Sequence, residues 1–325
     1  MSEFDLIYRY FVKDANQRKD VVLGIGDDCA LLTMPPQSLL AVSTDTLVSG
    51  VHFFPDVDPY SLGHKALAVN ISDLAAMGAD PAWVSLAITL PEVDQAWLAD
   101  FAKGFLSLAQ YFNVQLIGGD TTKGPLSITV TVHGHIPVGQ ALTRTQGKAG
   151  DWVYVTGTPG EAAFGLKLLQ GEADANVADS LRQQCISRLL QPTPRVAIGT
   201  ALRSLATACI DVSDGLAQDL GHILQGSQCG ADIYLDKLPL NPELVEATSF
   251  EQACQLALAG GDDYELLFTV AEENKSQLEK LVSTSATPVT CIGRLTSAKN
   301  SLTLLRDGEV CELNLAGWDH FANEK

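Results

Sequence analysis

The run Ala208-Cys209-Ile210-Asp211-Val212-Ser213-Asp214-Gly215 joins an apolar stretch to a helix-like stretch through two carboxylates and a glycine. The apolar residues predict a strand over 208–212, and the residues that follow predict a helix over 216–225. Strand-like and helix-like runs alternate in the same way along the whole chain. Such alternation is typical of an α/β (α+β) architecture.

Two domains are expected, because the chain has 325 residues and a domain takes about 150. The segment from Pro137 to Gly150 is rich in glycine, threonine and lysine and is predicted to connect them. We therefore expect an N-terminal domain over 1–140 and a C-terminal domain over 148–325. Strands are predicted over 39–43, 83–90, 114–117, 126–136, 152–156, 233–235, 266–270, 289–292 and 302–305. Helices are predicted over 61–77 and 94–112, from about 160, near 180–190 and over 195–206.

The composition excludes several classes of protein. The 21 lysines and arginines against 39 aspartates and glutamates give a formal net charge of −18, which disfavours a broad contact with nucleic acid or with an anionic membrane. No apolar segment is long enough for a membrane span, and the N-terminus lacks a signal core. The 7 cysteines lie too far apart for a CxxC redox or zinc motif. Free thiols in a reducing cytoplasm are therefore expected.

Short acidic segments lie where predicted strands or glycine turns meet helices. A single aspartate beside a glycine is ordinarily a turn or a helix cap, but so many such segments in one chain favour a shared site. Carboxylates at strand ends point toward the crevice where α/β proteins bind ligands, and unpaired they would repel one another. Several Mg²⁺ ions would resolve this repulsion and also bind phosphate oxygens. The segments are GIGDD (24–28), STD (43–45), NISD (70–73), GGDTT (118–122), DVSDG (211–215) and GGDDYE (260–265).

Other phosphate-binding and catalytic motifs are absent from the sequence. Gly24-Ile25-Gly26 begins like a dinucleotide fingerprint, but Cys29 stands at the third glycine position. Gly147-Lys148 is followed by Ala149 and does not complete a Walker A loop. The EF-hand, His-Glu-x-x-His, Gly-x-Ser-x-Gly and His-Arg-Asp patterns are also missing. If ATP binds, metal ions and glycine turns have to hold it.

The acidic segments occur within longer motifs that resemble those of the thiamine-monophosphate kinases, a family of the aminoimidazole ribonucleotide synthetase-like superfamily. The motifs run from residue 23 to residue 321, so the resemblance covers nearly the whole chain. They are LGIGDDCA (23–30), STD (43–45), KALAVNISDLAAMG (65–78), GGDTT (118–122), LTR (142–144), VTG (155–157), IDVSDG (210–215), GGDDYE (260–265) and GWDHF (317–321).

The resemblance implies a two-domain aminoimidazole ribonucleotide synthetase-like fold, in which N-terminal strands of two subunits form a shared barrel in a homodimer. It also implies that the γ-phosphoryl group of ATP passes directly to the phosphate of thiamine monophosphate, the last step of thiamine diphosphate biosynthesis. The implied site residues are Asp28, Ser43, Thr44, Asp45, Asp73, Asp120, Asp211 and Asp214 for Mg²⁺, Gly119, Asp120, Arg144 and Ser213 for the nucleotide, and His52, Asp262 and Trp318 for the thiamine compound. The family more often has glutamate where this chain has Asp262.

The residue types suit such a transfer. A phosphate monoester has a second pKa of about 6, so the acceptor is already mostly dianionic at neutral pH and needs no general base. The difficulty lies in bringing two polyanions together, which positioning and charge neutralisation solve. Arg144 could bind a phosphate through its planar fork, and Trp318 could stack on the cationic thiazolium.

Alternatives remain open for single residues and for the function. From the residues alone, Arg144 is equally a solvated surface arginine, His52 a hydrogen-bonded structural histidine and Trp318 a packed core residue. One rival function is that of another ATP-dependent enzyme of the superfamily, acting on an amide, selenide or carbamoyl compound. Selenide chemistry is disfavoured, because residues 1–28 contain no cysteine. The second rival is a nucleotide- or metal-sensing protein without catalytic activity.

Overall fold

A computed structural model describes residues 3–12, 15–173, 177–313 and 315. The chain forms two compact units, Met1–Ala141 and Leu142–Lys325. The elements of the first unit are α1 (Glu3–Ile7), a π-helical turn (Tyr8–Val12), β1 (Val21–Leu23), β2 (Leu31–Leu32), β3 (Ser38–Val48), α2 (Pro59–Ala76), β4 (Asp80–Leu90), α3 (Gln95–Tyr111), β5 (Gln115–Lys123) and β6 (Ser127–Pro137).

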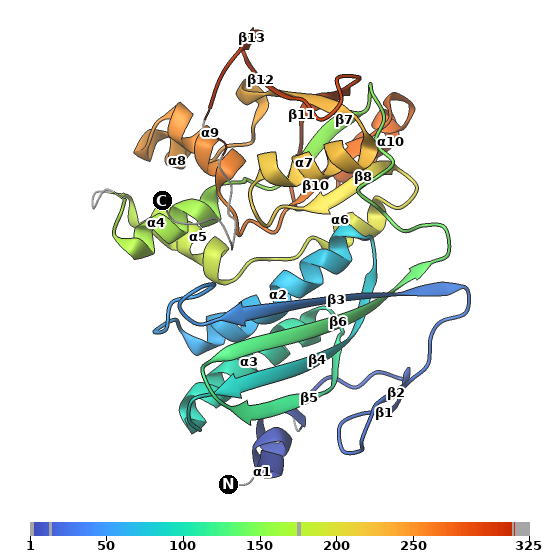
Figure 1. Ribbon diagram of the computed structural model, residues 1–325, viewed down its shortest axis with the longest axis vertical. Helices are drawn as coiled ribbons and strands as arrows, with labels where there is room; N and C mark the ends of the chain where they lie inside the picture. The colour runs from blue at the N-terminus through green and yellow to red at the C-terminus, as the bar shows by residue number, and fades with distance from the viewer. Residues whose placement is uncertain (1–2, 13–14, 174–176, 314, 316–325) are drawn as a thin grey trace. The chain divides into compact units, whose positions relative to one another are not determined.

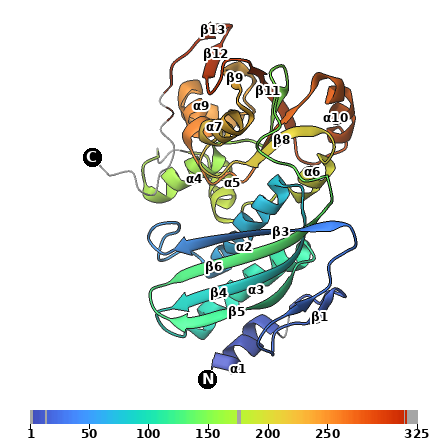
Figure 2. The ribbon, with the colours of Figure 1, turned by 45° about the vertical axis from the view of Figure 1, so that its right-hand side comes forward.

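A sheet with the strand order β3-β6-β4-β5 forms the body of the first unit. β4 and β5 run parallel, and the other neighbouring strands run antiparallel. Both α2 and α3 lie on one face of this sheet (Figure 1, Figure 2). Asp58 caps the start of α2 and Asp94 caps the start of α3, because each carboxylate accepts a backbone N–H of the first turn.

The strands of this sheet bury every second residue on the helix-covered face. In β6, the side chains of Ile128, Val130 and Val132 are buried, and the residues between them are partly exposed. From α2, Leu67 and Ile71 are buried in the same unit. The apolar residues of α2 and of alternate strand positions therefore form the core on one side of the sheet.

The opposite face of the sheet is partly exposed along β3 and carries both polar and apolar side chains. The hydroxyls of Thr44 on β3 and Thr131 on β6 bond to each other at 2.9 Å. Leu40 and Val42 lie on the same face of β3 as Thr44 and are 50% and 54% exposed. Among the described residues, no strand pairs with the outer edge of β3. The sheet is open, and the barrel implied for the dimer is not closed by one chain.

The second unit is built on a sheet with the strand order β13-β12-β9-β11-β7-β10-β8. β9 and β12 run parallel, and the other neighbouring strands run antiparallel. The predicted α/β (α+β) class is therefore confirmed. The elements are β7 (Trp152–Thr156), α4 (Glu161–Gln170), α5 (Asp179–Leu190), α6 (Val196–Ala201), β8 (Ala206–Asp211), α7 (Leu216–Ser227), β9 (Gly230–Tyr234), α8 (Pro242–Ala247), α9 (Phe250–Ala259), β10 (Leu266–Val270), α10 (Lys275–Val282), β11 (Val289–Thr296), β12 (Leu302–Arg306) and β13 (Glu309–Val310), with 3-10 turns at Leu235–Lys237 and Glu272–Asn274.

Separate apolar clusters hold the second unit together. In one cluster, Leu220 and Ile223 of α7 pack with Ile210 of β8 and with other buried strand residues. In another, Phe164 of α4 packs with Cys185 of α5 and with residues of α8 and α9. The strands that carry the acidic segments are therefore fixed by cores formed within the unit.

Most of the predicted strands and helices occur in the structure, and the differences have local causes. The helix predicted over 195–206 ends at Ala201, and Ala206 already belongs to β8. Ser204 has a left-handed φ of 68°, which is incompatible with continued helix. The sequence prediction omits α8, α9 and α10, which have 6, 10 and 8 residues and few turns in which to show a helical period. Within the described ranges, no helix is long and apolar enough to cross a membrane.

Candidate active site

In the first unit, β3 and α2 bring oxygen-bearing side chains together. Ser43 and Asp45 lie two residues apart on β3 and therefore point to the same face, toward α2. The Ser43 hydroxyl donates to Asp73 Oδ2 of α2 at 2.5 Å. The buried Asn70 side chain accepts the Asp45 N–H at 3.0 Å and donates to the Ala66 carbonyl at 3.0 Å. Because Asn70 and Asp73 stand three residues apart, one face of α2 makes both contacts with β3.

The carboxylates of this cluster repel each other. Burial raises the pKa of Asp45 from 3.8 to about 6, and the negative charge of Asp73 adds to the increase. Ser43, Asp45 and Asp73 present only oxygen atoms, which are the ligands that Mg²⁺ prefers in proteins. The donor set therefore fits a hard divalent cation, and such a cation would neutralise both carboxylates.

The structure separates the other predicted metal ligands of the first unit from this cluster. Asp120 is exposed on β5, which forms the opposite edge of the sheet from β3. Three strand spacings of about 4.8 Å place these edges roughly 14 Å apart. Asp28 is exposed between β1 and β2, and the Thr44 hydroxyl lies on the other face of β3. Among the residues that the structure describes, no group of three or more His, Cys, Asp or Glu side chains is placed to hold one metal ion.

The predicted ligand contacts Gly119 and His52 also belong to the first unit, Gly119 within β5 and His52 after the end of β3. Gly119 precedes Asp120 on β5, and a Cβ there would lie 1.8 Å from the Leu86 carbonyl oxygen, so the position admits only glycine. His52 follows β3, and its Nδ1 accepts the Val48 N–H at 3.0 Å. The proton of the neutral imidazole therefore lies on Nε2. A contact between His52 and the thiamine compound stays a prediction, with Nε2 as the donor.

In the second unit, segment 211–215 leaves β8 and enters α7. Asp211 is buried at the last position of β8, and Ser213 and Asp214 are partly exposed. The N–H groups of Ser213 and Asp214 both donate to Asp219 Oδ2, at 3.0 and 3.1 Å. Asp219 is buried in the first turn of α7, and burial raises its pKa to about 7 in spite of these bonds.

Asp219 and Arg144 complete this part of the site. The sequence prediction omits Asp219, although an acidic residue in the first turn of a helix is a recognisable signal. Its carboxylate holds the backbone of segment 211–215 in place. Arg144 is exposed, and its positive charge lowers the pKa of Asp219, although this is the smallest of the effects on that carboxyl. A contact between Arg144 and the nucleotide stays a prediction.

Loop 260–265 lies against segment 211–215. The Asp262 N–H donates to the Ser213 carbonyl and the Tyr264 N–H donates to the Val212 carbonyl, both at 2.8 Å. Asp262 and Tyr264 have left-handed backbone conformations, with φ of 66° and 49°, which cost roughly 1–2 kcal/mol each for residues with a Cβ. The Tyr264 hydroxyl donates to Asp262 Oδ1 at 3.1 Å. The loop therefore carries Asp262, the predicted thiamine contact, beside Ser213.

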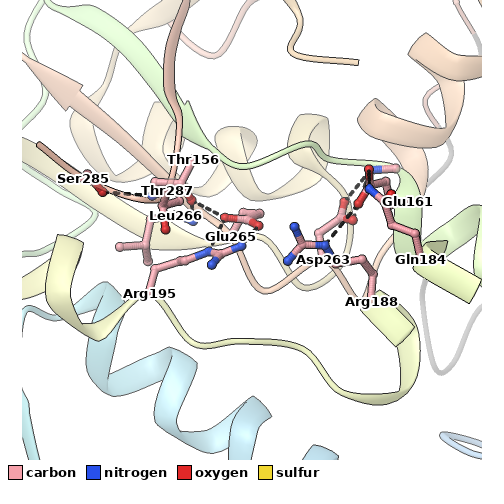
Figure 3. A network of polar contacts seen from close by, with 11 residues as sticks. Thr156, Glu161, Gln184, Arg188, Arg195, Asp263, Glu265, Leu266, Ser285 and Thr287 are labelled. Atoms are coloured by element: carbon pink, nitrogen blue, oxygen red, sulfur yellow. Dashed lines mark hydrogen bonds and ion pairs between the residues drawn. The ribbon is translucent and has the colours of Figure 1, made fainter. Parts of the chain in front are cut away.

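The other acidic residues of the loop are bonded to the rest of the unit (Figure 3). Asp263 accepts the Gly160 N–H at the start of α4 with both of its oxygens, at 3.0 and 2.9 Å. Glu265 is buried and accepts hydrogen bonds from Arg195 and from the Thr156 hydroxyl. Alternate residues of the loop therefore anchor it to α4, to the start of α6 and to β7.

The remaining predicted contact, Trp318, lies outside the described residues together with its motif at 317–321. Its contact with the thiamine compound stays a prediction. In the described part of the chain, the predicted residues gather in two places. Ser43, Asp45 and Asp73 form one group in the first unit, and Asp211, Ser213, Asp214 and Asp262 form the other in the second unit.

Models of known protein families match both units of the chain. The model of the AIR synthase related protein, N-terminal domain, matches residues 26–136. The model of the AIR synthase related protein, C-terminal domain, matches residues 148–304. The chain therefore belongs to the AIR synthase related proteins, a class defined by this pair of domains.

Comparison with individual proteins identifies the family within this class. The chain is 55% identical to the thiamine-monophosphate kinase of Escherichia coli (strain K12) over 323 residues, which are 98% of each chain. The crystal structure of thiamine-monophosphate kinase from Stenotrophomonas maltophilia K279a matches with a TM-score of 0.83 at 45% identity, over 91% of this chain and 93% of that chain. AaThiL complexed with AMPPCP and TMP matches with a TM-score of 0.77 at 31% identity, over 91% and 92% of the two chains. This chain is a member of the thiamine-monophosphate kinase family, as the motifs indicate.

Proposed function

We propose that this protein phosphorylates thiamine monophosphate with ATP, giving thiamine diphosphate and ADP, the last step of thiamine diphosphate biosynthesis. The relatives named thiamine-monophosphate kinase and the neighbour complexed with AMPPCP and TMP support this reaction. In the structure, the observation that carries the proposal is the facing pair of carboxylates, Asp45 and Asp73, with the Ser43 hydroxyl between β3 and α2. Such a site suits a divalent cation, and the joining of two phosphate groups depends on cations for charge neutralisation.

The proposal assigns several Mg²⁺ ions to the predicted ligands. When bound, Mg²⁺ supplies the positive charge that neutralises the phosphate oxygens during transfer. Asn70 holds the backbone of Asp45, and Ser43 orients the carboxylate of Asp73 through its hydrogen bond. The ligands in this set are Asp28, Ser43, Thr44, Asp45, Asp73, Asp120, Asp211 and Asp214.

The remaining work of the site is positioning rather than proton transfer, because the acceptor phosphate is already ionised. The Arg144 guanidinium and the Ser213 hydroxyl bind the nucleotide phosphates, and Gly119 and Asp120 are the predicted nucleotide contacts of the first unit. His52, Asp262 and Trp318 hold the thiamine compound, and Tyr264 orients the Asp262 carboxylate toward it. Holding the acceptor phosphate in line with the γ-phosphoryl group is the main contribution to the rate.

The proposal includes a homodimer. Asp120 and Asp45 belong to one set of ligands, yet the sheet edges that carry them lie roughly 14 Å apart in one chain. Two ligands of one Mg²⁺ ion lie only about 4 Å or less apart, so Asp45 and Asp120 of one chain would bind different ions, and a second subunit that brings its β5 near β3 would let them share one. The exposed Leu40 and Val42 on β3 support an interface at this place. Residues 1–140 then form the ATP-, Mg²⁺-binding and dimerisation domain, and residues 148–325 form the second domain.

The proposal also includes a cytoplasmic location without a nucleic-acid or membrane partner. All 7 cysteines lie in the described part of the chain and are free, as is usual in reducing compartments. The net charge of −18 opposes contact with polyanions that lack their own cations.

Phosphorus NMR of the purified protein with ATP, Mg²⁺ and thiamine monophosphate tests the reaction directly. We expect diphosphate signals with thiamine monophosphate and none with unphosphorylated thiamine as the acceptor. Release of phosphate without diphosphate would indicate another ATP-dependent enzyme of the superfamily, and absence of turnover would favour a binding protein. Asp45→Asn is expected to abolish transfer at limiting Mg²⁺, whereas Asp100→Asn, at an exposed site on α3, serves as the control.

A further inference from the structure

The conformation of loop 260–265 is imposed by contacts outside the loop. Asp262 and Tyr264 have left-handed backbone conformations, which are unfavourable for residues with a Cβ. Such conformations persist only where the surrounding structure determines them. The side chains of Asp263 and Glu265, which alternate with them, supply the anchoring contacts.

Glu265 forms a buried ion pair with Arg195 (Figure 3). The Arg195 Nε donates to Glu265 Oε2 at 2.6 Å, and Nη2 donates to Oε1, so the contact is bidentate. The two side chains are 11% and 5% exposed. The Thr156 hydroxyl donates to the same carboxylate at 2.5 Å and accepts the Leu266 N–H at 2.8 Å. A bidentate guanidinium contact fixes the plane of the carboxylate as well as its position.

From this arrangement we propose that Arg195 is a positioning residue for the thiamine side of the reaction. Through the carboxylate of Glu265, it fixes the backbone of the loop that presents Asp262. The connection is short, because Tyr264, which precedes Glu265, also donates its hydroxyl to Asp262 Oδ1 at 3.1 Å. This inference rests on the proposed function, since the contact between Asp262 and the thiamine compound belongs to that proposal.

Segment 211–215 is bonded to loop 260–265, since the Val212 N–H donates to the Glu265 carbonyl and the Asp262 N–H donates to the Ser213 carbonyl, both at 2.8 Å. On the nucleotide side, this segment has a further anchor outside the loop. The N–H groups of Ser213 and Asp214 donate to Asp219, which lies on α7 and not on the loop. Loss of the Arg195 contact therefore weakens the binding of thiamine monophosphate more than the binding of ATP. Substitution of a residue that only stabilised the fold would weaken the binding of both substrates alike.

A second ion pair with a buried carboxylate in the same unit provides a matched control (Figure 3). The Arg188 Nε donates to Glu161 Oε2 at 3.1 Å, and the Glu161 side chain is 1% exposed. Glu161 also accepts hydrogen bonds from Gln184 of α5 at 2.8 Å and from Asn241 before α8 at 2.7 Å. This pair therefore links helices to one another, whereas the Arg195 pair holds the loop.

Steady-state kinetics of the full-length protein distinguish a residue that positions the loop from one that only stabilises the fold. Lysine keeps the positive charge but cannot form the bidentate contact. In Arg195→Lys, we expect the KM for thiamine monophosphate to rise about tenfold, with the KM for ATP changed less than about twofold. Arg188→Lys is expected to change either KM by less than about twofold. Equal increases in both KM values of Arg195→Lys, or no increase in either, would overturn the inference.

A double-mutant cycle tests whether Arg195 acts through Asp262. Asp262→Asn alone is expected to raise the KM for thiamine monophosphate about tenfold, and the addition of Arg195→Lys should raise it no further. Additive effects would show that Arg195 acts elsewhere and would contradict the inference. If Arg195→Lys does not fold, the pair Arg195→Met with Glu265→Met removes both charges together, which a fold tolerates better than an unpaired buried charge. The same selective increase in KM is expected for that pair.

The two proposals fail in different ways. Absence of turnover in the unchanged protein would refute the proposed function and this inference with it. Normal turnover in the unchanged protein, together with an unchanged KM for thiamine monophosphate in Arg195→Lys, would refute the inference alone.

Discussion

Replacement of Asp45 by asparagine is expected to stabilise the metal-free protein, although it removes a predicted metal ligand. Burial and the charge of Asp73 raise the pKa of Asp45 from 3.8 to about 6 in the folded chain. The folded protein therefore prefers the protonated carboxyl, and its free energy of unfolding falls as the pH rises through this interval. A shift of about two pKa units corresponds to about 3 kcal/mol. Because Asp45 is only partly buried, screening by water lowers the expected effect to about 1–2 kcal/mol.

The size of the stabilisation by Asp45→Asn depends on pH. Below about pH 4, the carboxyl is protonated in both the folded and unfolded chain, so Asp45→Asn gains nothing. Above about pH 6, the carboxyl is ionised in both states and the gain is complete. In EDTA, the melting temperature of Asp45→Asn should exceed that of the unchanged protein by about 2–8 °C at pH 8, and by much less near pH 4.

Thermal melts followed by circular dichroism, with EDTA or with excess Mg²⁺, provide the measurement. Mg²⁺ should raise the melting temperature of the unchanged protein more than that of Asp45→Asn, because a ligand of the folded state stabilises it. Asp100→Asn removes one negative charge from an exposed site on α3 and controls for the change in net charge. A gain of equal size at both pH values, or a loss of stability at pH 8, would falsify the electrostatic argument.

Substitutions of Gly157, Val42 and Trp318 test the loop, the proposed dimer interface and the predicted thiamine contact, respectively. Gly157→Ala places a Cβ 2.1 Å from Glu265 Oε1 and should raise the KM for thiamine monophosphate; Gly171→Ala, which also has a left-handed φ but no neighbour within 4 Å, controls for backbone strain. Val42→Asp puts a charge on the exposed face of β3 and should convert the proposed dimer to a monomer in sedimentation analysis with unchanged circular dichroism; a persistent dimer would exclude an interface there. Trp318→Ala should raise the KM for thiamine monophosphate with little change in that for ATP, and the opposite pattern would move Trp318 to the nucleotide side.

Local sequence pattern placed segment 211–215 correctly at the junction of β8 and α7. It was wrong for segments 43–45 and 118–122, which lie within β3 and β5, and for segment 70–73, which lies within α2. Asn70 and Asp73 lie on one face of a helix, as their spacing predicts. Asp45 lies within β3, because this strand continues to Val48, beyond the predicted end at residue 43. The order of strands in a sheet depends on long-range pairing, which local pattern does not contain. The position of Asp120 at the edge opposite Asp45 therefore emerges only from the structure.

The sequence prediction also missed the roles of residues that act through tertiary contacts. Arg195 follows a pair of prolines in an unremarkable stretch, and its role depends on Glu265, 70 positions later. Tyr264 was visible as part of a motif, but its left-handed backbone and its bond to Asp262 require the folded loop. Asp219 had a recognisable helix-start signal, whereas its two bonds to segment 211–215 depend on the turn at Gly215.

The backbone donors where α4 and α7 begin are occupied by carboxylates of the chain itself. Such positions ordinarily attract phosphate, but here the Gly160 N–H is bonded to Asp263, and the N–H groups of Ser213 and Asp214 are bonded to Asp219. A nucleotide stripped of its cations would find these N–H donors already bonded at both places. The rate of catalysis should therefore follow the concentration of free Mg²⁺ more closely than that of ATP. A cell starved of magnesium would then make less thiamine diphosphate even while its energy charge remained high.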